Sequence, residues 1–218
     1  MERRSIQNLW IGLLSIALFI GWTLLTQTVD VHPVGETGTM VGLATINAWF
    51  HSRTGVNMQL YIITDWLGFV PIGICLLFGW IGFGQLRKRK HLLKVDRDLL
   101  FLGICYVLVI LAYLIFEIFP IHYRPIYIEN RLEASYPSST TLLVLSVMPT
   151  LVFQCNRRMQ NPVIKKIIYL LTVFFSLFMA IGRLLSGVHW LVDIIGSVFL
   201  SAGFFSLYKA AVLFYNEK

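Results

Sequence analysis

Six long apolar runs divide this chain, and they constrain its fold more than any other feature. Each run has roughly 20 residues with few charges, the length that a helix needs to cross a bilayer core of about 30 Å. The runs are continuous and do not alternate as the strands of a membrane barrel do. They lie roughly at residues 8–26, 60–83, 99–118, 139–155, 167–186 and 190–213. The sequence therefore predicts an all-α integral membrane bundle of six helices.

The composition is typical of a membrane protein with a single domain. Hydrophobic residues make up 57% of the 218 residues, and charged residues only 13%. No internal repeat or long polar linker divides the chain, so we expect a single transmembrane domain over residues 1–218. The first run resembles a signal peptide, but residues 21–27 offer no small-x-small cleavage site. We therefore expect it to be retained as the first helix.

The lysine and arginine residues orient the chain, because positive charge collects in cytoplasmic loops. Four of the 18, Arg53, Arg124, Arg131 and Arg183, fall on one side or at its boundary. The other fourteen fall on the opposite side: Arg3, Arg4, Arg87, Lys88, Arg89, Lys90, Lys94, Arg97, Arg157, Arg158, Lys165, Lys166, Lys209 and Lys218. We expect a multi-pass protein of the cell membrane with both termini in the cytoplasm, and the short loops favour a bacterial source.

The net charge of +7 follows from this topology. Basic clusters at the cytoplasmic surface are attracted to anionic lipid head groups, so the charge needs no nucleic acid to explain it. We expect the lipid bilayer as a partner, and no nucleic acid. The sequence does not predict an oligomeric state.

Three polar segments interrupt the apolar pattern, and the predicted topology places all three on the outer side. They are Glu117–Pro125 after the third run, Tyr136–Thr141 at the start of the fourth, and Gly182–Asp193 between the fifth and sixth. Ionisable groups at a membrane boundary usually have a function. We therefore expect the three segments to form one site.

The side chains of these segments favour a phosphate group. Arg124 and Arg183 each offer several donors to phosphoryl oxygens, and Ser138 stands at a helix start, where free N–H groups attract anions. Asp193 follows His189 by one helical turn and can accept its imidazole N–H, which leaves the other nitrogen free as a nucleophile. The alternative is that these residues have only structural roles: His189 packs in the interior, Arg124 is a loop cation, and Ser138 caps a helix.

The spacing Arg183-x5-His189-x3-Asp193, preceded by Arg124-Pro125 and by Tyr136-Pro137-Ser138, resembles the type 2 phosphatidic acid phosphatase (PAP2) superfamily, in its membrane lipid phosphatase branch. The resemblance implies a six-helix PAP2-type bundle that hydrolyses lipid phosphates or diphosphates without a metal or other cofactor. It implies that His189 attacks phosphorus to give a phosphohistidine, that Asp193 orients His189, and that Arg183 takes part in catalysis. It also implies that the phosphate is bound by Arg124, Arg183, Ser138, Ser139 and Thr140.

Two positions depart from the family pattern. The first motif, Lys-x6-Arg-Pro, would place a lysine where Glu117 stands. The second, Pro-Ser-Gly-His, would place at position 140 the histidine that protonates the leaving oxygen, and here that residue is Thr140. Threonine cannot act as a general acid near neutral pH, and that step is worth roughly 10²- to 10⁴-fold. A substitute acid could be His122, or His51 in the first outer segment.

Three functions fit this sequence. The first is a membrane phosphatase acting on a lipid phosphate or isoprenoid diphosphate at the outer face; a diphosphate, with its better leaving group, would suffer least from the missing acid. The second is a catalytically weakened or inactive protein that binds a lipid phosphate. The third is a transferase that passes a phospho-head group to an alcohol. In the outer segment, residues 41–50 are expected to form an amphipathic helix in the membrane interface.

Overall fold

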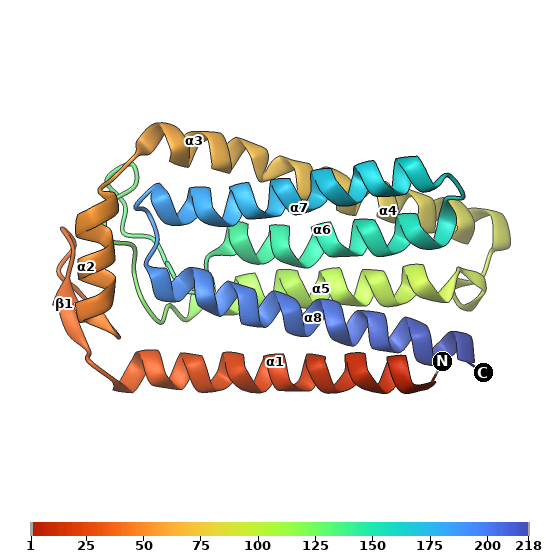
Figure 1. Cartoon of the computed structure of the whole chain (residues 1–218), viewed down its shortest axis with the longest axis horizontal. Helices are drawn as coiled ribbons and strands as arrows, with labels where there is room; N and C mark the ends of the chain where they lie inside the picture. The colour runs from red at the N-terminus through yellow and green to blue at the C-terminus, as the bar shows by residue number, and fades with distance from the viewer. Residues whose placement is uncertain (1, 218) are drawn as a thin grey trace.

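Long helices run along the longest axis of the computed structural model, which describes residues 2–217 (Figure 1). Six helical segments in this part of the chain are long and apolar enough to cross a membrane. They are α1 (Glu2–Thr28), α3 with α4 (Met58–Leu67 and Phe69–Arg89), α5 (Arg97–Ile118), α6 (Ser139–Arg158), α7 (Pro162–Leu185) and α8 (Leu191–Glu217). Each overlaps one of the six predicted runs, and the all-α membrane fold is confirmed.

The second span is the one that is broken, at Gly68 between α3 and α4. Pro71 follows three residues later and has no N–H to give to the preceding turn, so the regular helix is interrupted here. A Cβ at Gly68 would lie 2.8 Å from the Asp65 carbonyl oxygen and 3.5 Å from Cγ2 of Thr140. The break therefore sits directly against the start of α6.

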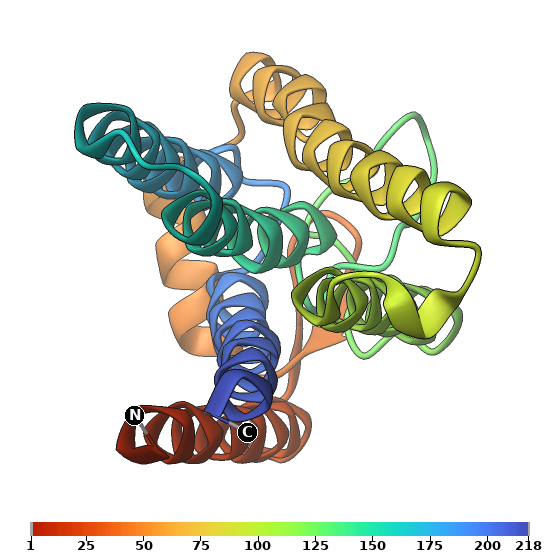
Figure 2. The ribbon, with the colours of Figure 1, turned by 90° about the vertical axis from the view of Figure 1, so that its right-hand side faces the viewer.

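Helix α8 lies inside the bundle between α1 and α6, as the view from the end with both termini shows (Figure 2). Glycines let α1 and α8 approach closely, as small residues commonly do in membrane helices. A Cβ at Gly12 would lie 2.7 Å from Cγ of Leu207, and one at Gly203 would lie 2.5 Å from Cδ1 of Ile16. This packing buries one face of α8 and fixes the helix that carries Asp193.

A small layer crosses the end of the bundle opposite to the termini (Figure 1). It consists of β1 (His32–Val34), β2 (Thr39–Val41) and α2 (Ala44–Thr54), and we term it the cap. The two strands pair antiparallel, with Val34 opposite Thr39. A helix forms slightly later than residues 41–50, as α2, but it is not the amphipathic helix that was expected: its apolar side chains are spread around the helix, with Trp49 exposed and Asn47 buried. The hairpin was not predicted, because strands of three residues are too short to show an alternating pattern.

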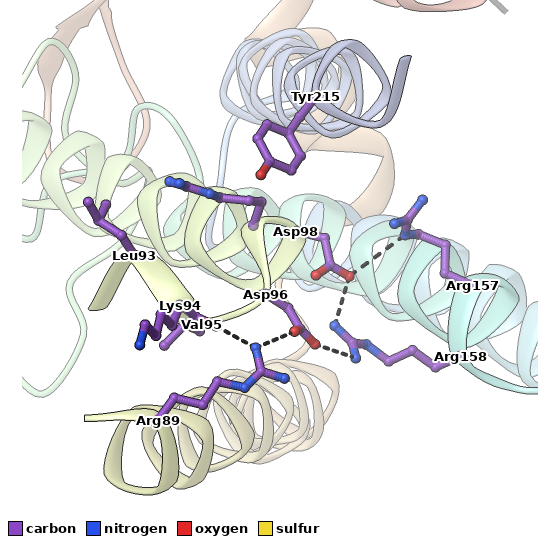
Figure 3. Close-up of a pocket in the computed structure, with 10 residues that line it drawn as sticks. Arg89, Leu93, Lys94, Val95, Asp96, Asp98, Arg157, Arg158 and Tyr215 are labelled. Atoms are coloured by element: carbon purple, nitrogen blue, oxygen red, sulfur yellow. Dashed lines mark hydrogen bonds and ion pairs between the residues drawn. The ribbon is translucent and has the colours of Figure 1, made fainter. Parts of the chain in front are cut away.

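The other end of the bundle carries both termini and a set of ion pairs, which we term the charged cluster. Arg158 pairs with Asp98 at 2.7 Å and with Asp96 at 3.4 Å, and Arg89 pairs with Asp96 at 2.9 Å. Arg157 adds a contact of 3.7 Å to Asp98. These residues tie the end of α4 and the start of α5 to the end of α6 (Figure 3). Lys218, one of the cations used for the orientation, lies outside the described residues.

Candidate active site

The three polar segments meet at the cap end of the bundle, as expected. The loop between α5 and α6 folds back on itself: the Arg124 N–H donates to the Glu133 carbonyl at 3.0 Å, and the Ser135 N–H to the His122 carbonyl at 2.9 Å. This pairing sets Arg124 beside Glu133 and His122 beside Ser135. The loop thereby brings one predicted phosphate ligand and one unpredicted serine towards the α7–α8 turn.

The α7–α8 turn brings Arg183 and His189 together. Gly187 has φ +70°, a conformation that favours glycine. A Cβ at this position would lie 2.1 Å from the Gly55 carbonyl oxygen, so the turn packs directly against the end of α2. Nη2 of Arg183 lies 3.5 Å from Nε2 of His189. One ring nitrogen of the predicted nucleophile therefore faces the predicted phosphate-binding arginine.

The other ring nitrogen of His189 faces Asp193. Nδ1 lies 3.5 Å from Oδ2 of Asp193, and Oγ of Ser135 lies 3.2 Å from the same Nδ1. The Ser135 hydroxyl also donates to Oδ2, and the backbone N–H of Trp190 donates to it at 2.8 Å. Asp193 is thus held by two donors besides the histidine, and its carboxylate favours a proton on Nδ1. Ser135 stands just before the second motif, and nothing in the sequence pattern distinguished it.

Burial keeps His189 neutral. Burial is the largest of the effects that together lower the pKa of His189 to about 4; the positive charges of Arg124 and Arg183 act in the same direction, against the opposite effect of Asp193. At neutral pH the ring is therefore uncharged. With its proton on Nδ1, the lone pair of Nε2 is free and points to the arginine side of the site.

Two buried arginines form the other wall of the site. Arg183 is 1% exposed and Arg124 is 8% exposed. Their guanidinium groups lie over the ring of Tyr61, at 4.9 Å and 5.8 Å from its centroid. Within residues 2–217, Nε of Arg183 and both Nε and Nη1 of Arg124 have no hydrogen-bond partner. Buried donors normally have partners, so this wall is suited to bind an anion.

Each of these arginines also has a carboxylate neighbour that belongs to none of the three motifs. Nη2 of Arg124 lies 3.0 Å from Oε2 of Glu133, and Nη1 of Arg183 lies 3.5 Å from Oδ1 of Asp65. Tyr61 and Asp65 both come from α3. A sequence signal for Asp65 did exist, because it is an acidic residue within an apolar span.

The start of α6 closes the site from a third side. The Ser138 N–H donates to the Asp193 carbonyl at 3.3 Å, and its hydroxyl pairs with that of Thr141 at 3.0 Å. Ser138 is fully buried, so its side chain is part of the packing between α6 and α8. Ser139 and Thr140 open the helix, where backbone N–H groups have no partner in the preceding turn. These N–H groups are suited to donate to phosphoryl oxygens.

The remaining candidates lie around this centre. Nδ1 of His122 lies 3.6 Å from Oδ1 of Asp193, the carboxylate oxygen that does not contact His189, and His122 is buried. His51 packs on the turn, with Nε2 at 3.1 Å from the Gly187 carbonyl oxygen. Glu117 is exposed and lines a small pocket of about 180 Å³ with Arg124 and Glu133. Within the described chain, no three His, Cys, Asp or Glu side chains are grouped so that they could hold a metal ion.

An apolar groove of about 590 Å³ runs from the start of α6 along the bundle, between α4, α5 and α6. Its polar end is formed by Asp65, Ser139 and Thr140. The rest of its wall is largely hydrocarbon, including Phe69, Ile72, Leu76, Ile110, Leu143 and Val147. The groove therefore joins a polar end beside Arg183 to a space suited to an apolar chain.

Comparison with known proteins agrees with this geometry. A family model described as the PAP2 superfamily matches residues 99–216, which contain all three motifs. The fold is similar to that of a transmembrane PAP2 type phosphatidylglycerolphosphate phosphatase from Bacillus subtilis, with a TM-score of 0.66 and 15% identity over 95% of this chain and 96% of that one. A search of curated proteins finds no match. Tyr61 and Asp65 lie outside the residues that the family model matches.

Proposed function

The chain belongs to the PAP2 superfamily, and we propose that it is a membrane lipid phosphatase that works through a phosphohistidine on His189. One observation carries the proposal. A buried neutral imidazole has Nδ1 beside Asp193 and Ser135 and Nε2 beside Arg183. This is the arrangement that an oriented nitrogen nucleophile needs next to an anion-binding wall.

Arg124 and Arg183 bind the phosphoryl group in this mechanism. Their unpartnered guanidinium nitrogens donate to its oxygens, and the N–H groups at Ser139 and Thr140 add donors at the start of α6. The charge on these oxygens is stabilised while the phosphorus atom is held near Nε2 of His189. Asp193 and Ser135 then stabilise the positive ring that forms when the nitrogen attacks.

The groove supports a lipid as the substrate. Its apolar length accommodates an acyl or isoprenoid chain, while its polar end lies next to the phosphate-binding arginine. Burial of apolar chain stabilises the complex by about 0.8 kcal/mol for each CH₂ group. The substrate class is therefore a lipid phosphate or an isoprenoid diphosphate.

The orientation belongs to the same proposal: one transmembrane domain in a bacterial cell membrane, with both termini in the cytoplasm and the site on the outer face. The uneven distribution of lysine and arginine supports it. A cysteine at position 131 should react with a membrane-impermeant thiol reagent in intact cells, and a matched Lys88→Cys variant only after permeabilisation. The unsubstituted chain with Cys75, Cys105 and Cys155 gives the background. The reverse labelling pattern would contradict this orientation.

Phosphate release by the purified protein in nanodiscs tests the activity. Phosphatidic acid, phosphatidylglycerophosphate and undecaprenyl diphosphate are offered separately, with His189→Ala as the control. We expect release by the unsubstituted protein and a loss of roughly 10⁴-fold or more in the variant, because the covalent step needs Nε2. Equal background rates for both proteins with every substrate would overturn the phosphatase proposal.

The replacement of the family histidine by Thr140 favours one alternative, a lipid-phosphate-binding protein with little or no turnover. Saturable binding of phosphatidic acid without release of phosphate would identify it. A lipid product with a new head group would instead identify a transferase.

A further inference from the structure

Asp65 is a carboxylate inside a membrane span. It lies roughly two helical turns, or about 10 Å, from the start of α3. The residues around it, Tyr61-Ile62-Ile63-Thr64-Asp65-Trp66-Leu67, are otherwise uncharged. A charged side chain at such a position is costly and usually has a function.

The neighbours of Asp65 are the parts of the site that handle the phosphate and the lipid chain. Oδ1 lies 3.5 Å from Nη1 of Arg183. The same side chain lines the polar end of the groove with Ser139 and Thr140. About one turn further along, the chain at Gly68 packs against Thr140. A Cβ added at Gly68 would lie 3.5 Å from Cγ2 of Thr140. Asp65 therefore lies beside the position where the family pattern has its proton donor.

We propose that Asp65 is the general acid that protonates the leaving oxygen of the substrate, in place of the histidine that Thr140 replaces. The inference rests on the proposed phosphatase function and assigns one further catalytic residue to it. The lipid occupies the groove, so its ester oxygen leaves towards the groove end of the site. Asp65 is the carboxyl group at that end.

The proposed step balances in atoms and charge. Nε2 of His189 forms a bond to phosphorus while the bond from phosphorus to the lipid oxygen breaks, and the Asp65 carboxyl proton moves to that oxygen. The products are the lipid alcohol, the phosphohistidine and the Asp65 carboxylate. Water then attacks phosphorus, gives one proton back to Asp65, and releases hydrogen phosphate and neutral His189.

Besides Asp65, the titratable side chains that line the groove are Cys75, Tyr106 and Tyr113, none of them a carboxyl or imidazole group. The histidines and the other carboxyl groups around the site lie elsewhere. His122 is buried against Asp193 at 3.6 Å, and His51 contacts the backbone of Gly187. Glu133 pairs with Arg124 at 3.0 Å and lines the small pocket with Glu117, separate from the groove. None of these four side chains is part of the groove wall.

A leaving-group comparison tests the proposal. The proton donor matters for an alkyl phosphate, whose alkoxide leaves poorly, and hardly for a nitrophenyl phosphate, whose phenolate leaves without help. For Asp65→Asn we expect kcat to fall roughly 10²- to 10⁴-fold with hexadecyl phosphate and by less than about 10-fold with the nitrophenyl ester. Adding Thr140→His to this variant should restore turnover of hexadecyl phosphate, because the family acid is then present.

Glu133→Gln is the matched control, because it also removes a carboxylate from a phosphate-binding arginine but not from the groove. We expect it to change both rates by the same factor. If Asp65→Asn also slows both substrates by one factor, Asp65 only positions Arg183 and the inference is overturned. Failure of the phosphatase proposal is recognised separately, because unsubstituted protein and His189→Ala would then show the same background with the nitrophenyl ester.

Discussion

The two ends of the bundle both hold arginines and carboxylates, yet they use them in opposite ways. In the charged cluster the arginine side chains are partly exposed, 42% for Arg89 and 32% for Arg158, and they are paired with Asp96 and Asp98. At the site end, Arg124 and Arg183 are almost completely buried and keep guanidinium nitrogens without hydrogen-bond partners within residues 2–217. The first arrangement leaves its arginines paired, whereas the second, despite the carboxylates of Glu133 and Asp65, keeps buried donors that are suited to bind an anion.

This difference separates structure from function among similar residue types. Exposed ion pairs contribute only about 0–1 kcal/mol each to stability. Buried donors without partners lower stability unless a ligand satisfies them, at about 1–3 kcal/mol for each group. In the proposed function, this cost at the site end is offset when a phosphate binds.

The largest expected contrast comes from the same conservative change at each end. Arg183→Lys should lower kcat/KM for lipid phosphate roughly 10²- to 10³-fold, because a lysine cannot replace the planar set of donors in a buried site. Arg158→Lys should leave kcat/KM within about twofold, because Arg158 lies at the end of the bundle opposite to the site (Figure 1). Phosphate-release kinetics in nanodiscs check both variants. Equal losses at the two ends would contradict the division described above.

A smaller contrast is expected on lowering the pH. The folded pKa of His189 is lowered to about 4 from its ordinary value of 6.5, so the neutral form is favoured by folding. The ring should stay uncharged from pH 7 down to about 5 and take up a proton near pH 4. The stability that it contributes is complete above about 6.5 and falls as the pH drops from there towards 4. Histidine ¹⁵N NMR spectra, assigned with His189→Ala, check the titration; protonation near pH 6.5 would contradict it.

The smallest effect is expected from a neutral substitution in the charged cluster. Asp98→Asn removes ion pairs to Arg157 and Arg158, and we expect the free energy of unfolding to fall by about 1 kcal/mol. Turnover of the lipid substrate should not change, because the cluster lies at the other end of the bundle. Denaturation in detergent and phosphate release, measured on the same preparation, test both parts. A loss of activity without a loss of stability would show that the two ends are coupled.

The long-range pattern of the sequence was enough to predict the spans and the meeting of the three polar segments. Continuous apolar runs specify membrane helices because backbone groups in lipid must be bonded within the helix. The helix α1 begins at Glu2, earlier than the predicted start at residue 8, because a helix does not have to end where the apolar core ends. Hydropathy therefore locates a span better than it locates the ends of its helix.

The parts of the site that were not predicted are contacts between segments without a motif. Ser135 acquires its place only when the α5–α6 loop folds back and pairs with His122. Tyr61 reaches both arginines only because α3 packs beside α7. The contact of His122, suggested by the sequence as a substitute acid, with Asp193 at 3.6 Å likewise joins two separate segments. Composition does not encode such neighbours, and only Asp65 carried a signal of its own, a charge within an apolar span.

The tight contact between Gly187 and Gly55, directly after α2, ties the cap to the turn that carries His189. His51 of the cap contacts the Gly187 carbonyl, and just beyond the cap the Asn57 N–H donates to the Ser186 carbonyl at 3.0 Å. The cap therefore cannot move away from the bundle without disturbing the turn that holds His189. In the proposed mechanism, such a movement would also displace the nucleophile.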